Sequence, residues 1–163
     1  MQKNEKSMVK EKKHRLDLGC YEGEIRASFT LCIQGRKQVF ITSDIVKNFA
    51  TILEDSAKKH SCVNWIYLFM PDHFHCVLHG TNSNANIWKS IVLFKQKTGY
   101  WFSKNMPATQ WQKDFFDYVH RKETELQKHI FYILNNPVRA GIVNKWQDYR
   151  FKGALDFNLE DLG

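Results

Sequence analysis

Apolar side chains recur along this chain with two distinct periods, and the periods predict its elements. Polar and apolar residues alternate over residues 25–33, and two largely apolar runs cover residues 62–70 and 73–79, with a tight turn at 71–72 between them. Side chains two residues apart point to the same face of a strand, so these three segments indicate strands. A fourth strand or extended segment is expected over residues 111–119.

Three other segments place apolar residues at three- and four-residue spacing, which is typical of an amphipathic helix. They cover residues 43–60, 84–104 and 122–136. Thr42 or Ser43 can cap the first helix and Asn84 the second, while Pro137 ends the third. The order strand, helix, strand, strand, helix, strand, helix predicts an α+β fold, a ferredoxin-like split βαβ antiparallel sheet with an added C-terminal helix.

Length and composition predict one folded domain. The chain has 163 residues, of which 43% are apolar and 14% aromatic, enough for a hydrophobic core. We expect residues 1–19, which hold many lysines and few large apolar groups, to form a flexible basic arm, and residues 20–163 to form the domain. The formal net charge of +7 and the pI near 9.2 indicate a polyanionic partner, most commonly nucleic acid.

The spacing and surroundings of the cysteines indicate a reducing compartment. They form no CxxC pair, and Cys32, Cys62 and Cys76 lie within apolar runs, which is typical of buried thiols in a reducing environment. No apolar run approaches the roughly 20 residues that cross a bilayer. We therefore expect a soluble, cytoplasmic protein.

Residues 69–78 hold the most distinctive chemistry of the chain, because two histidines alternate with Phe74 inside an apolar run. In a strand His73 and His75 project together to one face, while Phe74 faces the core on the other. Two imidazoles held side by side form half of a metal site.

The last predicted helix offers the other half. Tyr132 and Asn136 are four residues apart and therefore lie on one helical face. If this helix packs over the strand with His73 and His75, Asn136 supplies an amide oxygen to the same cation and the Tyr132 hydroxyl lies beside it. Two imidazoles and one amide oxygen leave coordination positions open, which suits Mn²⁺ or Mg²⁺ better than a closed structural Zn²⁺ site.

Tyr132 is the candidate nucleophile. A phenol with a pKa of about 10 attacks poorly at neutral pH. It becomes useful when a phosphodiester is oriented for in-line attack and a metal stabilises the transferring phosphoryl group. A tyrosine phosphate ester retains the bond energy, so a later DNA hydroxyl can reseal the backbone. These residues therefore indicate breaking and rejoining of strands rather than plain hydrolysis.

Two segments resemble the motifs of the HUH-type single-tyrosine transposases. Residues 70–75, Met-Pro-Asp-His-Phe-His, are similar to the family's histidine, hydrophobe, histidine motif. Residues 132–143, Tyr-Ile-Leu-Asn-Asn-Pro-Val-Arg-Ala-Gly-Ile-Val, are similar to its tyrosine helix. The longer Asn-Pro-Val-Arg-Ala-Gly ending most resembles the REP-associated tyrosine transposases, which are insertion-sequence transposase-like proteins. The likeness covers approximately residues 25–150.

The resemblance implies a metal-dependent endonuclease and strand transferase for single-stranded hairpin or palindromic DNA. It implies that His73, His75 and Asn136 bind Mg²⁺ or Mn²⁺, and that Tyr132 forms a 5′-phosphotyrosine and releases a 3′-hydroxyl. It also implies a bacterial, nucleoid-associated protein. Related insertion-sequence enzymes often act as dimers with shared active sites, so a homodimer is one expected assembly. The chain departs from the family at Tyr118, near which members commonly carry a histidine.

Several residues keep alternative interpretations. Tyr118 and Tyr149 are fallback nucleophiles, although neither has a matching polar residue one helical turn away. Asp72 either orients a histidine or only shapes the turn, and His129 either lies next to the metal ligands or is exposed on its helix. His79 shares the face of the histidine pair but lies about 13 Å from His75 along the strand, too far for direct coordination.

Basic residues on the predicted helices and loops can line a phosphate track, although an ordinary solvated face explains any one of them equally well. They are Lys95, Lys97, Arg121, Lys122 and Arg139.

Two other functions stay open. One is a non-cleaving single-stranded nucleic-acid-binding regulator, which needs no metal. The other is a metal-dependent phosphoesterase for small substrates, which has no need of Tyr132.

Overall fold

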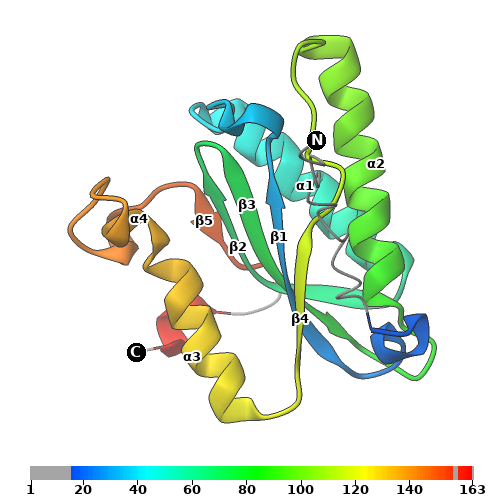
Figure 1. Cartoon of the computed structure of the whole chain (residues 1–163). Coiled ribbons are helices and arrows are strands. Elements are labelled where there is room, and N and C mark those ends of the chain that lie inside the picture. The colour runs from blue at the N-terminus through cyan, green and yellow to red at the C-terminus, as the bar shows by residue number, and fades with distance from the viewer. Residues whose placement is uncertain (1–15, 156–157, 163) are drawn as a thin grey trace, which may run out of the picture.

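The computed structural model describes residues 16–155 and 158–162. Its centre is a five-stranded antiparallel sheet in the order β4-β1-β3-β2-β5 (Figure 1). The strands are β1 Arg26–Cys32, β2 Cys62–Met70, β3 His73–Gly80, β4 Phe116–His120 and β5 Lys152–Gly153. The α+β, ferredoxin-like prediction is confirmed, and β5 is an addition at the β2 edge that the sequence pattern did not indicate.

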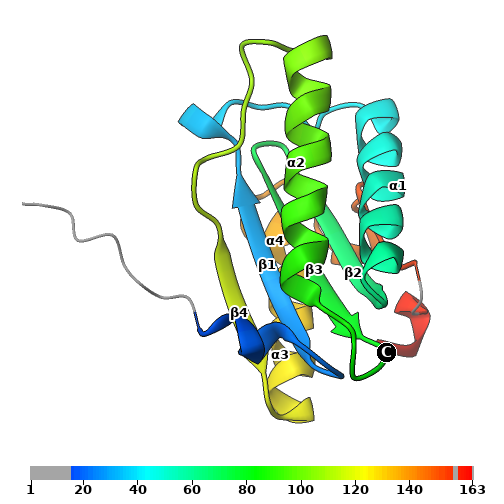
Figure 2. The same cartoon turned by 90° about the vertical axis from the view of Figure 1, so that its right-hand side faces the viewer.

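Helices cover both faces of the sheet. α1 (Ser43–Lys59) and α2 (Ile87–Asn105) lie on one face, while α3 (Glu123–Leu134) and α4 (Asn136–Arg139) lie on the other (Figures 1 and 2). Short 3₁₀ turns complete the described part: η1 Leu18–Tyr21, η2 Gln34–Arg36, η3 Trp146–Asp148 and η4 Leu159–Leu162. Within the described ranges, no helix is long and apolar enough to span a bilayer.

The predicted starts of the second helix and of the fourth strand were wrong. The second helix begins after Asn86, whose side chain accepts a hydrogen bond from the Lys89 backbone N–H at 2.8 Å. Asn84 instead donates its own N–H to a neighbouring asparagine side chain and caps no helix. The fourth strand begins at Phe116 rather than at Trp111. Trp111 forms only an isolated β-bridge, with Ile33, the residue after β1.

The predicted N-terminal arm falls largely outside the described residues, which exclude 1–15. Of its last residues, Leu18 and Gly19 belong to η1, and the Tyr21 ring at the end of this turn is buried.

The sheet face under α1 and α2 holds the aromatic part of the core. Phe49 on α1 is fully buried and has six aromatic neighbours at ring-centroid distances from 5.2 to 6.4 Å: Phe40, Phe69, Phe94, Trp101, Phe102 and Trp111. Tilted and edge-on ring pairs add packing energy beyond the area that they bury. Cys32, Cys62 and Cys76 are buried free thiols, as predicted.

The opposite face, under α3, is polar near its centre. Residues that pair directly across antiparallel strands share a face, and Thr30 of β1 pairs with His75 of β3 and with Phe116 of β4. Two residues before Thr30 in β1, Ser28 pairs with Tyr118. The Ser28 hydroxyl lies 2.5 Å from His120 Nε2. Ser28 and His120 are both buried, so this contact joins β1 to β4 beneath α3.

The Ser28–His120 contact predicts a pH-dependent stability. Burial, and then the charges of His129 and Arg26, lower the pKa of His120 to about 4, whereas an unfolded histidine titrates near 6.5. Between these values the unfolded chain binds more protons, so the free energy of unfolding falls as the pH falls from 6.5 to 4, by up to roughly 3 kcal/mol. Urea unfolding at several pH values measures this loss. A Ser28→Ala/His120→Leu double variant removes both partners and is expected to lose less stability over the same window. An identical loss in both proteins contradicts the assignment to His120.

Candidate functional site

The paired histidines project from the middle of the sheet. β3 is flanked by β1 and β2, and its first residues carry His73 and His75 on the α3 face, with ring centroids 4.9 Å apart. Phe74 between them is fully buried against Phe69 and Phe94 on the opposite face. The alternation anticipated from the sequence therefore places both imidazoles side by side.

His73 is oriented by a carboxylate. Its Nδ1 lies 2.6 Å from Asp72 Oδ1, and Arg36 Nε donates to Asp72 Oδ2 at 2.8 Å. Burial tends to raise the pKa of Asp72, but the hydrogen bonds and charges of His73 and Arg36 outweigh it and hold the pKa below its usual value. Asp72 therefore does more than shape the turn, because it fixes the ring of His73 with Nε2 turned away from it.

His75 is held from two sides. Thr30 Oγ1 lies 2.8 Å from its Nδ1, and the Asn136 amide nitrogen lies 3.2 Å from its Nε2. Burial, followed by the charges of His73 and other nearby cations, lowers the pKa of His75 to about 3. The ring is therefore neutral at pH 7, with a lone pair on one nitrogen. Sequence reasoning missed Thr30, although polar residues at alternate positions of an apolar strand, as at Ser28 and Thr30, were the available signal.

α3 and α4 bring Asn136 to this point. Glu123, at the start of α3, forms an ion pair with Arg26 of β1. The stripe of buried residues on α3, Leu126, Ile130, Ile133 and Leu134, packs against the sheet. α3 ends at Leu134, so the prediction that Pro137 ends it was wrong. Pro137 lies in the first turn of α4, where a missing backbone N–H costs nothing. Gly141 follows with a φ of 71°, a conformation that glycine adopts without strain.

Tyr132 lies on α3, one helical turn before Asn136, and its side chain is 58% exposed. The short turn of α4 brings Arg139 back over it: the guanidinium carbon is 3.9 Å from the ring centroid, and Nη1 donates to the Tyr132 carbonyl at 2.9 Å. The other ring neighbour is His129, 6.1 Å away between centroids. The structure thus brings Asn136 into contact with His75, which lies beside His73, and places Tyr132 one helical turn before Asn136.

His129 connects Tyr132 to the polar sheet face. Its ring centroid is 4.9 Å from that of the buried His120, and Tyr118 stacks on it at 5.9 Å with an interplanar angle of 12°. Burial lowers the pKa of His129. Sequence reasoning considered His129 but overlooked His120, whose alternation with Phe116 and Tyr118 on β4 was the signal that placed it on this face.

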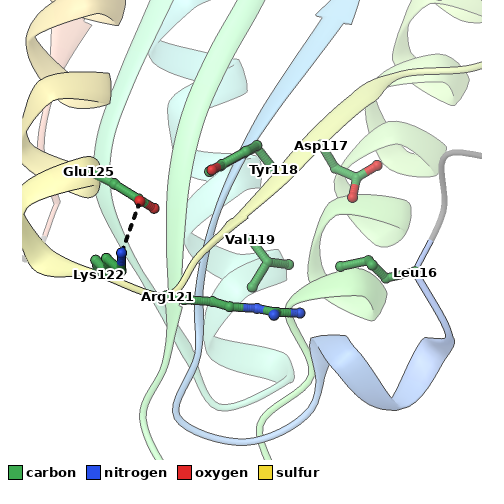
Figure 3. A pocket seen from close by; sticks show the side chains of 7 residues that line it. All are labelled: Leu16, Asp117, Tyr118, Val119, Arg121, Lys122 and Glu125. Carbon is green, nitrogen blue, oxygen red and sulfur yellow. Dashed lines mark ion pairs between the residues drawn. The ribbon is translucent and has the colours of Figure 1, made fainter.

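The remaining candidates are dispersed. Lys95 and Lys97 lie on α2, on the other side of the sheet from the histidines (Figure 2). Arg121 and Lys122 lie where β4 passes into α3, and Arg139 contacts Tyr132. Lys122 and Arg139 are on the side of the candidate site, whereas the Arg121 side chain extends toward Leu16 (Figure 3).

Two of the alternative residues have structural roles. Tyr149 is buried and donates its hydroxyl to the Phe69 carbonyl at 2.6 Å. His79 packs edge-on against Trp65 with a centroid separation of 5.3 Å. Neither residue contacts the histidine pair.

Comparisons with known proteins agree on one family. Residues 23–136 match the family model described as Transposase IS200 like. A REP-associated tyrosine transposase of Escherichia coli (strain K12) is 27% identical over 127 residues, which cover 76% of this chain and 72% of that protein. A Haemophilus influenzae protein named for the same group is 24% identical over 134 residues, 76% of each chain.

The fold has a solved counterpart. The structure of a REP-associated tyrosine transposase bound to a REP hairpin matches with a TM-score of 0.69 at 18% identity, covering 81% of this chain and 78% of that one. At this identity the match establishes the shared architecture.

Thr30 is expected to stabilise the site measurably. Thr30→Val keeps the shape of the side chain but leaves a buried nitrogen of His75 without a partner, which costs about 1–3 kcal/mol of unfolding free energy. The matched control is Thr51→Val, since the exposed Thr51 hydroxyl bonds only to a carbonyl of its own helix. Urea unfolding of both variants measures the difference. Equal effects of the two substitutions contradict the role of Thr30.

Proposed function

This chain belongs to the IS200-like transposase family, and we propose that it is a metal-dependent endonuclease and strand transferase for single-stranded DNA. The contact of Asn136 with His75, beside His73, carries the proposal. It links the helix pair that bears the exposed phenol of Tyr132 to the strand that bears the paired imidazoles.

The donor set fits a divalent metal. Asp72 and Thr30 occupy Nδ1 of His73 and His75, so both rings offer Nε2. A half-turn of the Asn136 amide exchanges its nitrogen and oxygen and presents Oδ1 to the same point. Among the described residues no group of three or more His, Cys, Asp or Glu side chains could hold a metal, and the third ligand of the proposed site is the Asn136 amide. Two nitrogens and one oxygen with open positions suit Mn²⁺ or Mg²⁺.

Tyr132 supplies the nucleophile. Its oxygen forms a bond to phosphorus as the bond to the 3′ oxygen breaks, giving a 5′-phosphotyrosine and a 3′-hydroxyl. The phenol loses its proton and the departing oxygen gains one. A bound divalent ion would stabilise the charge on the transferring phosphoryl group. Arg139 lies over the Tyr132 ring, with its guanidinium carbon 3.9 Å from the ring centroid, and adds a positive charge beside the proposed nucleophile.

Hairpin or palindromic DNA is the proposed substrate. The net charge of +7 supports a polyanion, and the solved structural neighbour is bound to a REP hairpin. The alternative is a regulator that binds the same DNA without cutting it. The two functions can be distinguished by experiment, because only the enzyme forms a covalent bond to its substrate.

Tyr132→Phe is expected to abolish covalent DNA adducts while binding of the hairpin is retained. The measurement uses an end-labelled hairpin oligonucleotide with unpaired flanks and Mn²⁺, and detects label that stays on the protein after denaturation. Tyr118→Phe is the matched control, since Tyr118 is similarly exposed and lies on the same face but has no amide one turn away. Adducts that persist in Tyr132→Phe exclude this nucleophile, and a wild-type protein that binds without forming adducts favours the regulator.

Asp72→Asn is expected to weaken Mn²⁺ binding about 10- to 100-fold, because the amide orients His73 less strongly and lowers its basicity. Calorimetric titration with Mn²⁺ in the absence of DNA measures this directly. Asp55→Asn, which removes an exposed carboxylate from α1 on the other face, is the control and should leave the affinity unchanged. His73→Ala should remove binding. Unchanged Mn²⁺ affinity in His73→Ala contradicts the metal site.

A further inference from the structure

Two large aromatic side chains on β4 are exposed next to the candidate site. Phe116 is 71% exposed and Tyr118 is 52% exposed, although both lie in a strand of the central sheet. They are two residues apart and therefore share one face, and we refer to them as the β4 aromatic pair. The alternate residue, Asp117, points to the other side and accepts a hydrogen bond from the Tyr21 hydroxyl at 2.5 Å. The strand is therefore held in place, while the two side chains of the β4 aromatic pair are exposed to solvent.

The β4 aromatic pair lies on the same sheet face as the histidines. Phe116 pairs with Thr30, and Thr30 pairs with His75, so the three residues form one row across the sheet. With neighbouring strands about 4.8 Å apart, the Phe116 backbone is roughly 10 Å from that of His75. α3 covers His75, which is buried, but leaves Phe116 uncovered.

A line of rings leads from the β4 aromatic pair to the nucleophile. Tyr118 stacks on His129, which in turn neighbours Tyr132, and the Arg139 guanidinium lies over the Tyr132 ring. His129 supports the inner face of the Tyr118 ring and fixes its orientation. The exposed rings are therefore continuous with the proposed point of cleavage.

The charges around Tyr118 favour a base over a phosphate. A shallow hollow beside β4 is lined by Leu16, Asp117, Tyr118, Val119, Arg121, Lys122 and Glu125 (Figure 3). Figure 3 shows Tyr118 on the side of α3 and Asp117 on the side of α2. Lys122 lies 4.0 Å from Glu125, so the two cations and two carboxylates of the hollow balance. Flat neutral rings of nucleobases suit such surroundings, because stacking on an aromatic side chain needs no net charge.

We infer that the β4 aromatic pair is a stacking platform for unpaired nucleobases that flank the phosphodiester facing Tyr132. This inference rests on the proposed function for the position of the cut, and it adds a binding subsite outside the metal ligands and the nucleophile. Stacking tolerates any base, so the platform holds a single strand in place without reading its sequence.

The test measures stacking without cleavage. In a Tyr132→Phe background, a hairpin oligonucleotide whose unpaired thymidylate flank carries one 2-aminopurine is titrated with protein, and the label is moved along the flank. Stacking on an aromatic ring quenches 2-aminopurine fluorescence. We expect quenching at one or two adjacent positions, lost in a Phe116→Leu/Tyr118→Leu variant, whose affinity falls about 5- to 100-fold.

Two controls keep the result specific. Tyr100→Leu removes an aromatic ring of similar exposure from α2, on the other side of the sheet, and is expected to change neither quenching nor affinity. Phe116→Leu alone spares the Tyr118–His129 stack, so a partial loss in this variant does not come from loss of that stack. The slope of log affinity against log salt should stay that of the parent, since no phosphate contact is removed.

Three results overturn the platform. They are unchanged quenching and affinity in the double variant, a salt slope that falls with the affinity, and a parent protein that sedimentation shows to be a dimer where the variant is a monomer. The last result would show that the β4 aromatic pair is a dimer interface, formed where two copies of this chain meet at the edge strand β4. Covalent adducts of wild-type protein report separately on the proposed function: adducts without quenching overturn only the platform, and quenching without adducts overturns only the nuclease.

Discussion

The antiparallel register of β1 against β3 sets Thr30 directly opposite His75, and the geometry of the candidate site depends on this pairing. A slip of one residue would turn His73 and His75 into the aromatic core and bring Phe74 to the polar face. The buried aromatic rings on the α1 and α2 side prevent such a slip, because Phe74 fits between Phe69 and Phe94 there. Packing on one face of the sheet therefore positions the chemistry on the other.

α3 is attached to that polar face by contacts of different kinds along its length. The Arg26–Glu123 ion pair holds its first turn, buried aliphatic residues hold its middle, and Asn136 at the start of α4 contacts His75. Tyr132 lies near the end of this attachment and points to solvent. Tyr132, the proposed nucleophile, is thus carried by a well-anchored helix and is accessible to a large substrate such as the proposed hairpin DNA.

The polar face has a cost for stability. Ser28, His75 and His120 are buried among strands, and His120 Nδ1 has no hydrogen-bond partner. A buried polar atom without a partner costs on the order of 1–3 kcal/mol. The aromatic cluster around Phe49 offsets this cost, since each favourable ring pair contributes about 0.5–1.5 kcal/mol beyond its buried area. The molecule therefore separates its stabilising face from the face that carries the proposed site.

The sequence alone determined the α+β order of elements, the central hairpin and the placement of His73 and His75 on one face, because alternation in a strand is a local property. It also indicated the spacing of Tyr132 and Asn136. Only the tertiary structure showed that Asn136 contacts His75, that Thr30 and Asp72 hold the two rings, and that Arg139 lies over Tyr132. The hydrophobic pattern also did not predict the exact ends of the elements, such as the cap of α2 at Asn86 and the end of α3 at Leu134. These features depend on strand register and on how α3 crosses the sheet, which join residues distant in the chain and leave no periodic trace in it.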